Sequence, residues 1–262
     1  MPTFSSFDKE NKTVTQEYDL TDKQSKGAFL TKVFGMMFLC LAITTVVAAG
    51  LGYGFLYLLK STATDGVYNS NLISGMLVTL IVSAIALLIM SFVLPITFAR
   101  GRHNILVPLI IYVVLMGVLL SCFTWLFEPI ILVEAFGITT LIFGLMALLG
   151  FLSKGKVAGL GVVMLGLLIG AGLLALANWL MMLFGGVSET NVMLLWIVSF
   201  AIFAFLMLMT IWDVARISKI AEQGSNSGNN LIYYCSYILY SDFIAILIRV
   251  IYYLAIITGR RR

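Results

Sequence analysis

The sequence predicts an all-α membrane protein with seven transmembrane helices. Hydrophobic residues make up 61% of its 262 positions and charged residues only 11%, whereas a soluble domain carries about 25% charged residues. Four stretches contain no Asp, Glu, Lys or Arg, and each is long enough for a helix of about 20 residues to cross the hydrocarbon core. The apolar runs are continuous rather than alternating, which is not the pattern of a membrane barrel. The four stretches are 66–99, 103–127, 157–188 and 190–212.

Seven apolar segments follow one another with short connections, which leave no room for a second folded domain. Ahead of them, residues 1–32 hold five lysines and five acidic residues and too few large apolar side chains to bury a core. We therefore expect a mobile polar tail, residues 1–32, and one transmembrane domain, residues 33–262. The predicted spans are Val33–Leu59, Leu72–Phe98, Ile105–Phe127, Ile130–Leu152, Val157–Phe184, Val192–Asp213 and Leu231–Thr258.

Small residues and polar turns mark features of individual spans. The fifth span is rich in glycine, and Gly166 and Gly170 form a GxxxG step, which predicts close packing of that helix against a neighbour. Residues 223–230 are polar throughout and predict a turn between the sixth and seventh spans.

Basic residues are unevenly distributed between the two sides of the predicted bundle. If the N-terminus is cytoplasmic, nine Lys and Arg residues lie on the cytoplasmic side and four on the other. This distribution favours a cytoplasmic N-terminus. Seven spans then place the C-terminus outside, and the three final arginines, Arg260, Arg261 and Arg262, oppose that assignment.

Two aspartates lie inside the last two apolar segments. Asp213 ends the run 191–212, and Asp242 lies about eleven residues into the run 231–258. A carboxylate at mid-membrane costs about 2.5–3.5 kcal/mol on insertion scales, so each is a functional-site hypothesis. If the sixth helix continues to about Ile220, the two lie about 10 Å and 16 Å from the same membrane side and can approach. We expect them to titrate as one unit.

The seventh span carries a second charge on the same helix face. Arg249 follows Asp242 by seven residues, which is close to two helical turns and about 10.5 Å along the axis. Two charges on one face predict that this helix is enclosed by other helices. Tyr237 and Tyr240 lie deep enough to hydrogen-bond to the acidic pair.

A simpler interpretation of these charges stays open. Asp213 with Arg216, or Asp242 with Arg249, could form an ion pair that serves assembly alone. Glu134, near the start of the fourth span, suits the positive end of a helix dipole. Glu134 and Arg249 are the other charges that we expect to be buried.

Metal and disulfide chemistry have little support. The three cysteines, Cys40, Cys122 and Cys235, all fall in apolar spans and form no CxxC pair, so we expect small buried side chains. His103 is the single histidine, which excludes a multi-histidine metal site.

Three ordered strings resemble a known family. Residues 134–137, Glu-Ala-Phe-Gly, with Thr139 and Phe143 following, resemble the signature of the Bax inhibitor family, the transmembrane Bax-inhibitor-motif proteins. The strings 212–217, Trp-Asp-Val-Ala-Arg-Ile, and 237–244, Tyr-Ile-Leu-Tyr-Ser-Asp-Phe-Ile, resemble its two aspartate motifs. The resemblance runs from about residue 25 to the C-terminus. Within the family, the chain resembles a bacterial-type member.

The resemblance implies six helices around a central seventh and a pH-sensitive calcium leak. In that mechanism Asp213 and Asp242 are the pH sensor and gate, and an arginine after the second span latches them. Arg100 matches that arginine best, with Arg102 as the second choice. The chain departs from the family pattern at Ala245, where a polar residue is common, so the family pH set-point does not transfer.

The resemblance implies calcium as the transported ion rather than as a tightly bound cofactor. Two carboxylates make at most a weak calcium site, because a tight one needs six to eight oxygen ligands. A second hypothesis is an interaction protein whose tail modulates another membrane protein, such as a membrane protease. An intramembrane hydrolase is weaker, because Asp242 lacks a GxGD context; we expect no enzymatic activity and no nucleic-acid partner. Short loops suit a bacterial inner membrane, with the lipid bilayer as the main partner.

Overall fold

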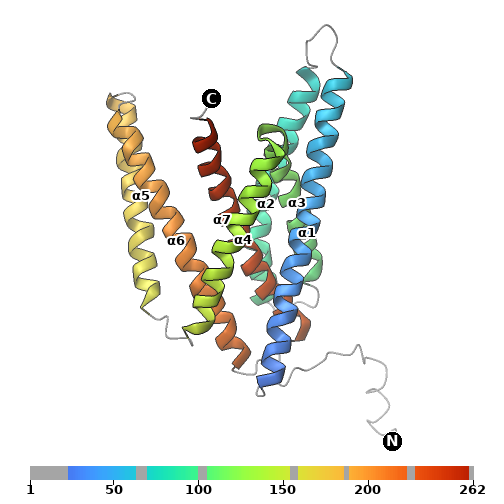
Figure 1. The fold of residues 1–262 in the computed structure, drawn as a ribbon, viewed down its shortest axis with the longest axis vertical. Helices are drawn as coiled ribbons and strands as arrows, with labels where there is room; N and C mark the ends of the chain where they lie inside the picture. The colour runs from blue at the N-terminus through green and yellow to red at the C-terminus, as the bar shows by residue number, and fades with distance from the viewer. Residues whose placement is uncertain are drawn as a thin grey trace, which may run out of the picture.

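Seven helices form one bundle in a computed structural model of the chain (Figure 1). The structure describes residues 23–62, 70–99, 105–153, 159–185, 189–222 and 228–259. All seven helices in this part of the chain are long and apolar enough to cross a membrane, which confirms the predicted fold class. They are α1 (Lys23–Ser61), α2 (Ser70–Ala99), α3 (Leu106–Leu126), α4 (Pro129–Leu152), α5 (Leu160–Gly185), α6 (Glu189–Glu222) and α7 (Gly228–Gly259).

The first and last helices begin and end at opposite ends of the bundle, as an odd number of crossings requires (Figure 1). We call these ends the Lys23 end and the Gly259 end. Helix α6 finishes and helix α7 starts at the Lys23 end (Figure 1). The two aspartates therefore both lie in the half of the bundle nearer the Lys23 end.

Helix α1 starts well before the predicted first span. It begins at Lys23, and Phe29 is only 2% exposed within the hydrophobic core. The apolar face of α1 thus extends into the segment predicted to be a tail, because Phe29 and Val33 occupy successive turns of one buried face. The predicted mobile tail, 1–32, is shortened accordingly, and residues 1–22 lie outside the described residues.

Helix α7 is the centre of the packing. It packs closely against α1, α4 and α6 and also contacts α2 and α3. Helix α5 packs against α6, on the far side from α1 (Figure 1). The central seventh helix is therefore confirmed, with five helices in contact with it and α5 placed outside α6. The outer surfaces of α2 and α5 expose large apolar side chains, as lipid-facing helices do.

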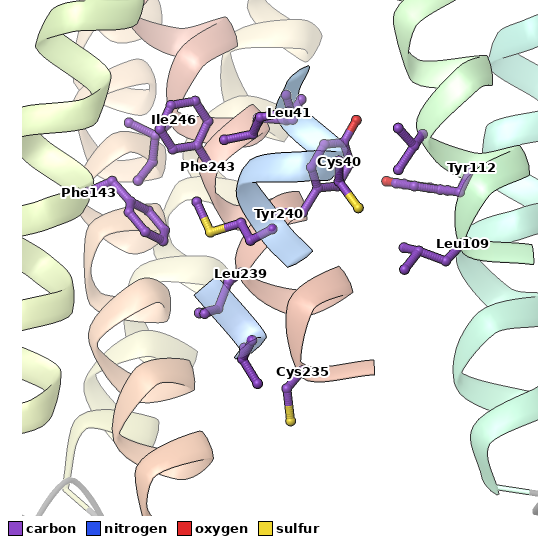
Figure 2. Packing of buried hydrophobic residues seen from close by; sticks show 14 of the residues in the cluster. Cys40, Leu41, Leu109, Tyr112, Phe143, Cys235, Leu239, Tyr240, Phe243 and Ile246 are labelled. Atoms are coloured by element: carbon purple, nitrogen blue, oxygen red, sulfur yellow. The ribbon is translucent and has the colours of Figure 1, made fainter. Parts of the chain in front are cut away.

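The core surrounds α7 in the half nearer the Lys23 end. Figure 2 shows Tyr240 and Phe243 of α7 among side chains from α1, α3 and α4. The ring of Phe243 lies 5.4 Å from that of Phe136 and 5.5 Å from that of Phe143, both on α4. Ser236 of α7 donates a hydrogen bond of 2.9 Å to the Val33 carbonyl of α1. Aromatic packing and polar contacts between helices replace the hydrophobic driving force that lipid removes.

Close helix approach occurs at glycines other than the predicted ones. A methyl group at Gly166 or Gly170 would have no neighbour within 4 Å, so the predicted GxxxG contact is wrong. A methyl at Gly117 of α3 would lie 2.7 Å from Val47 Cβ of α1, and one at Gly52 would collide with Thr124. The α1–α3 interface depends on these two glycines.

The enclosure of α7 gives a first prediction. Ile246 is 0% exposed, whereas Ile257 on the same helix is 52% exposed. In a background lacking the native Cys122, we expect Ile246→Cys to resist a lipid-soluble maleimide and Ile257→Cys to react with it. The measurement is the labelled fraction by mass spectrometry in bilayer-reconstituted protein. Equal labelling of the two variants would mean that α7 faces lipid.

Candidate functional site

Asp213 lies on a stretch of α6 that faces the protein interior. Its side chain is 3% exposed, and the following residues Val214, Ile217 and Ala221 are also buried. They recur on one side of the helix, so this side is turned toward the bundle. The packing of these buried neighbours on α6 keeps the Asp213 side chain inside the bundle.

Asp242 of α7 faces Asp213 of α6. Their carboxyl groups lie within hydrogen-bonding reach of each other. A carboxylate has no hydrogen to donate, so a hydrogen bond between the two groups requires that at least one of them is protonated. The Oδ2 atom of Asp242 is buried and has no hydrogen-bond partner. The predicted pairing of the two aspartates is present, and one of its oxygens is left without a bond.

Helix α4 packs against α6 next to Asp213. Gly150 of α4 lies against α6, because a methyl group there would be 2.8 Å from Val214 Cβ and 2.9 Å from the Ile211 carbonyl oxygen. Val214 directly follows Asp213. Helices α4, α6 and α7 each pack on the other two, so the carboxyl pair sits where three helices meet.

The two arginines nearest in sequence do not neutralise the pair directly. Arg216 is exposed, and its guanidinium lies 5.3 Å from the centre of the Trp212 ring. Its charge acts on Asp213 across space, but it is not the hydrogen-bond partner of that carboxyl group. Arg249 is half-buried and is not among the groups that act on Asp242. The ion pairs considered as a simpler interpretation are absent from this described site.

The remaining predicted charges have different outcomes. Glu134 is exposed, so its predicted burial is wrong. It precedes Ala135, which lies on the buried side of α4, and the 100° step between them turns Glu134 outward near the helix start. Arg100 and Arg102, the predicted latch, lie outside the described residues.

The hydroxyl groups of Tyr237 and Tyr240 form hydrogen bonds with residues other than the two aspartates. The hydroxyls of Tyr240 and Thr44 are hydrogen-bonded at 2.7 Å, and Thr44 also donates to the Cys40 carbonyl at 3.0 Å. Tyr237 is hydrogen-bonded to Tyr112, with ring centres 5.1 Å apart. The prediction that Tyr237 and Tyr240 bond the aspartates is therefore wrong. These bonds tie α7 to α1 and α3 just below the carboxyl pair, toward the Lys23 end of α7.

A cavity of about 370 Å³ lies between α1, α3, α4 and α7, on the side of Tyr240 that is nearer the Gly259 end. Its lining is apolar apart from tyrosine and threonine hydroxyls, and it includes Leu120, Leu132 and Leu247. An ion gains nothing from such walls, because they offer few oxygens to replace its water.

The donors for a metal ion are few. Within the described ranges, no three His, Cys, Asp or Glu side chains gather at one place. Asp213 and Asp242 are the two carboxylates that come together, and Cys40 and Cys235 are buried as free thiols. Two carboxylates supply too few oxygens for a tight calcium site, and the weak calcium contact stays a prediction.

Two structural features of α4 were not predicted from the sequence. Thr139 of α4 is 0% exposed, and its hydroxyl has no hydrogen-bond partner. Gly150 sets the approach of α4 to α6. A hydroxyl inside an apolar span and a glycine near its end were the available signals, but both occur widely in membrane helices.

These features define a seven-helix integral membrane protein with two neighbouring carboxyl groups, from α6 and α7, near the packing of α4. The family described as inhibitor of apoptosis-promoting Bax1 matches residues 26–259. The chain belongs to this Bax inhibitor family. A search of curated proteins found no match.

Proposed function

We propose that the protein is a pH-sensitive leak channel for calcium, gated by Asp213 and Asp242. Family membership and the buried carboxyl pair support this proposal. We take the conformation described above as the closed state, because the cavity between α1, α3, α4 and α7 has mostly apolar walls that do not suit an ion.

The observation that carries the proposal is the hydrogen bond between the two carboxyl groups. It joins α6 to α7 only while at least one of the two carboxyl groups is protonated. Two ionised carboxylates at this separation repel each other, and two protonated ones lose the charge that attracts a cation. A change in proton occupancy therefore alters both the α6–α7 contact and the charge that a cation meets.

Calcium would bind this site only briefly. The two carboxylates supply fewer oxygens than a tight calcium site needs, so the ion keeps much of its water. Weak binding allows the ion to leave, as conduction requires. The latch role stays with Arg100, or with Arg102, and we place the protein in a bacterial plasma membrane on the basis of its short loops.

The test is calcium entry into proteoliposomes that contain the purified full chain and an enclosed calcium dye. We expect entry above that of protein-free liposomes, with one sigmoidal change across a pH series. The rate should depend on the calcium gradient and should not need ATP. Entry equal to that of protein-free liposomes at every pH would refute the channel.

A role as an interaction protein remains the alternative. Deleting residues 1–22 removes none of the described helices. If the bundle itself conducts, the deleted protein keeps the leak and its pH response. If the tail docks another membrane protein, the deletion abolishes that association. Cleavage of a membrane peptide would indicate the hydrolase instead, and we expect none.

A further inference from the structure

Thr139 is an unusual threonine in this bundle. Thr44, Thr140 and Thr210 each donate a hydrogen bond to the carbonyl four residues earlier, as threonines in apolar helices commonly do. The Thr139 hydroxyl makes no such bond to Ala135 and has no other partner, although the residue is fully buried. An unbonded buried hydroxyl costs free energy, so a partner absent from the protein atoms is expected.

Thr139 lies on the side of α4 that packs against α7. It lies one turn after Phe136 and one turn before Phe143, and both of those rings contact Phe243. Figure 2 shows Phe143 of α4 beside Phe243. Residues three and four apart on a helix share a face, so Thr139 faces α7 at the level of Phe243. Asp242 is the residue next to Phe243 in sequence.

The second observation is on α7. Asp242 Oδ2 is also buried and also lacks a hydrogen-bond partner, while the carboxyl group as a whole is bonded to Asp213. The buried hydroxyl of Thr139 on α4 and the buried Oδ2 of Asp242 on α7 thus lie on two helices that pack against each other, and neither atom has a hydrogen-bond partner. Buried water molecules typically occupy such places, because they bond to polar groups that the protein leaves unsatisfied.

We propose that Thr139 is a positioning residue of the aspartate site, with its hydroxyl hydrogen-bonded to Asp242 Oδ2 through one buried water molecule. The bond links α4 to the α6–α7 carboxyl pair and fixes the orientation of the Asp242 carboxyl group. It deepens the proposed function, because it stabilises the closed arrangement of the three helices.

The direct test is infrared spectroscopy of the reconstituted full chain, which reads the C=O stretching band of the protonated carboxyl group. The band that disappears in Asp242→Asn identifies the pair. We expect Thr139→Val, which keeps the shape and removes the hydroxyl, to move that band to higher frequency, because a hydrogen bond to the carbonyl lowers its frequency. Thr139→Ser should restore the wild-type band.

Thr140→Val is the matched control, because Thr140 is the next residue on α4, is exposed and is bonded to its own helix. It should leave the band unchanged. A wild-type band in Thr139→Val would overturn the assignment of Thr139 and leave the proposed channel standing. If Asp242→Asn removes no band, the shared proton is absent, and both the inference and the proposed gate fail.

Calcium entry provides the functional reading. We expect Thr139→Val to raise the leak about fivefold at a pH where the wild type is closed, the change that losing one ordinary hydrogen bond produces in an equilibrium. Thr139→Ser should keep the wild-type rate. A raised leak in both variants would indicate a packing defect rather than loss of the hydroxyl and would contradict the inference.

Discussion

Replacing either aspartate by asparagine should abolish the pH response of the leak. Asparagine has nearly the shape of aspartic acid and still forms hydrogen bonds, but it does not ionise in this range. In Asp213→Asn and Asp242→Asn the remaining carboxyl group has no acidic partner, so the coupled titration is lost. Calcium entry into proteoliposomes across a pH series should change from a sigmoidal step to a flat line in both variants.

The double variant distinguishes one unit from two independent groups. Because the carboxyls share one proton, Asp213→Asn with Asp242→Asn should differ little from either single variant. Glu134→Gln is the control, because Glu134 is exposed on α4 and should not contribute to the step. If the pH step survives in both single aspartate variants, the two-aspartate sensor is wrong, and its loss in Glu134→Gln would transfer the role to that residue.

Enlarging Gly150 should separate α4 from α6 beside the same pair. A methyl group there would meet Val214 Cβ at 2.8 Å and the Ile211 carbonyl oxygen at 2.9 Å, and a backbone oxygen moves only if a helix moves. Overpacking of this kind costs about 1–3 kcal/mol for Gly150→Ala and more for Gly150→Leu. We expect lower thermal unfolding temperatures in detergent, in the order wild type, Ala, Leu, and a raised leak.

Gly144→Ala is the matched control on the same helix. A methyl group at Gly144 has no neighbour within 4 Å, so the substitution tests helix propensity without a clash. Alanine favours a helix over glycine by about 1 kcal/mol, although lipid-exposed positions need not show all of it. Stability should stay equal or rise. If Gly150→Ala is as stable as Gly144→Ala, the close approach of α4 and α6 at Gly150 is wrong.

The sequence was sufficient for the number of helices and for the two acidic residues. An apolar run of about 20 residues is a strong signal, because the bilayer leaves every backbone polar group to be bonded within its own helix. Charges inside such runs are costly and therefore conspicuous. Asp213 and Asp242 were identifiable on that basis, and the helical spacing from the shared membrane side made their approach predictable.

The sequence was less informative about partners. It suggested that Tyr240 bonds the aspartates, whereas the folded chain bonds it to Thr44. It suggested close packing at Gly166, whereas the close approach is at Gly150 and Gly117. It also suggested a buried Glu134, which the rotation of α4 turns outward. Each of these errors concerns the face that a helix turns toward its neighbours.

The sequence by itself determined the transmembrane class, the seven spans and the presence of two costly carboxyl groups. Tertiary structure alone decided that these two carboxyl groups come within hydrogen-bonding reach of each other, that α4 packs against both of their helices and that the Thr139 hydroxyl is buried without a partner. The physical reason is that lipid solvates apolar side chains about as well as the protein core does. A helix that is apolar all round carries no stripe to fix its rotation, so only packing against the other helices selects its inner face.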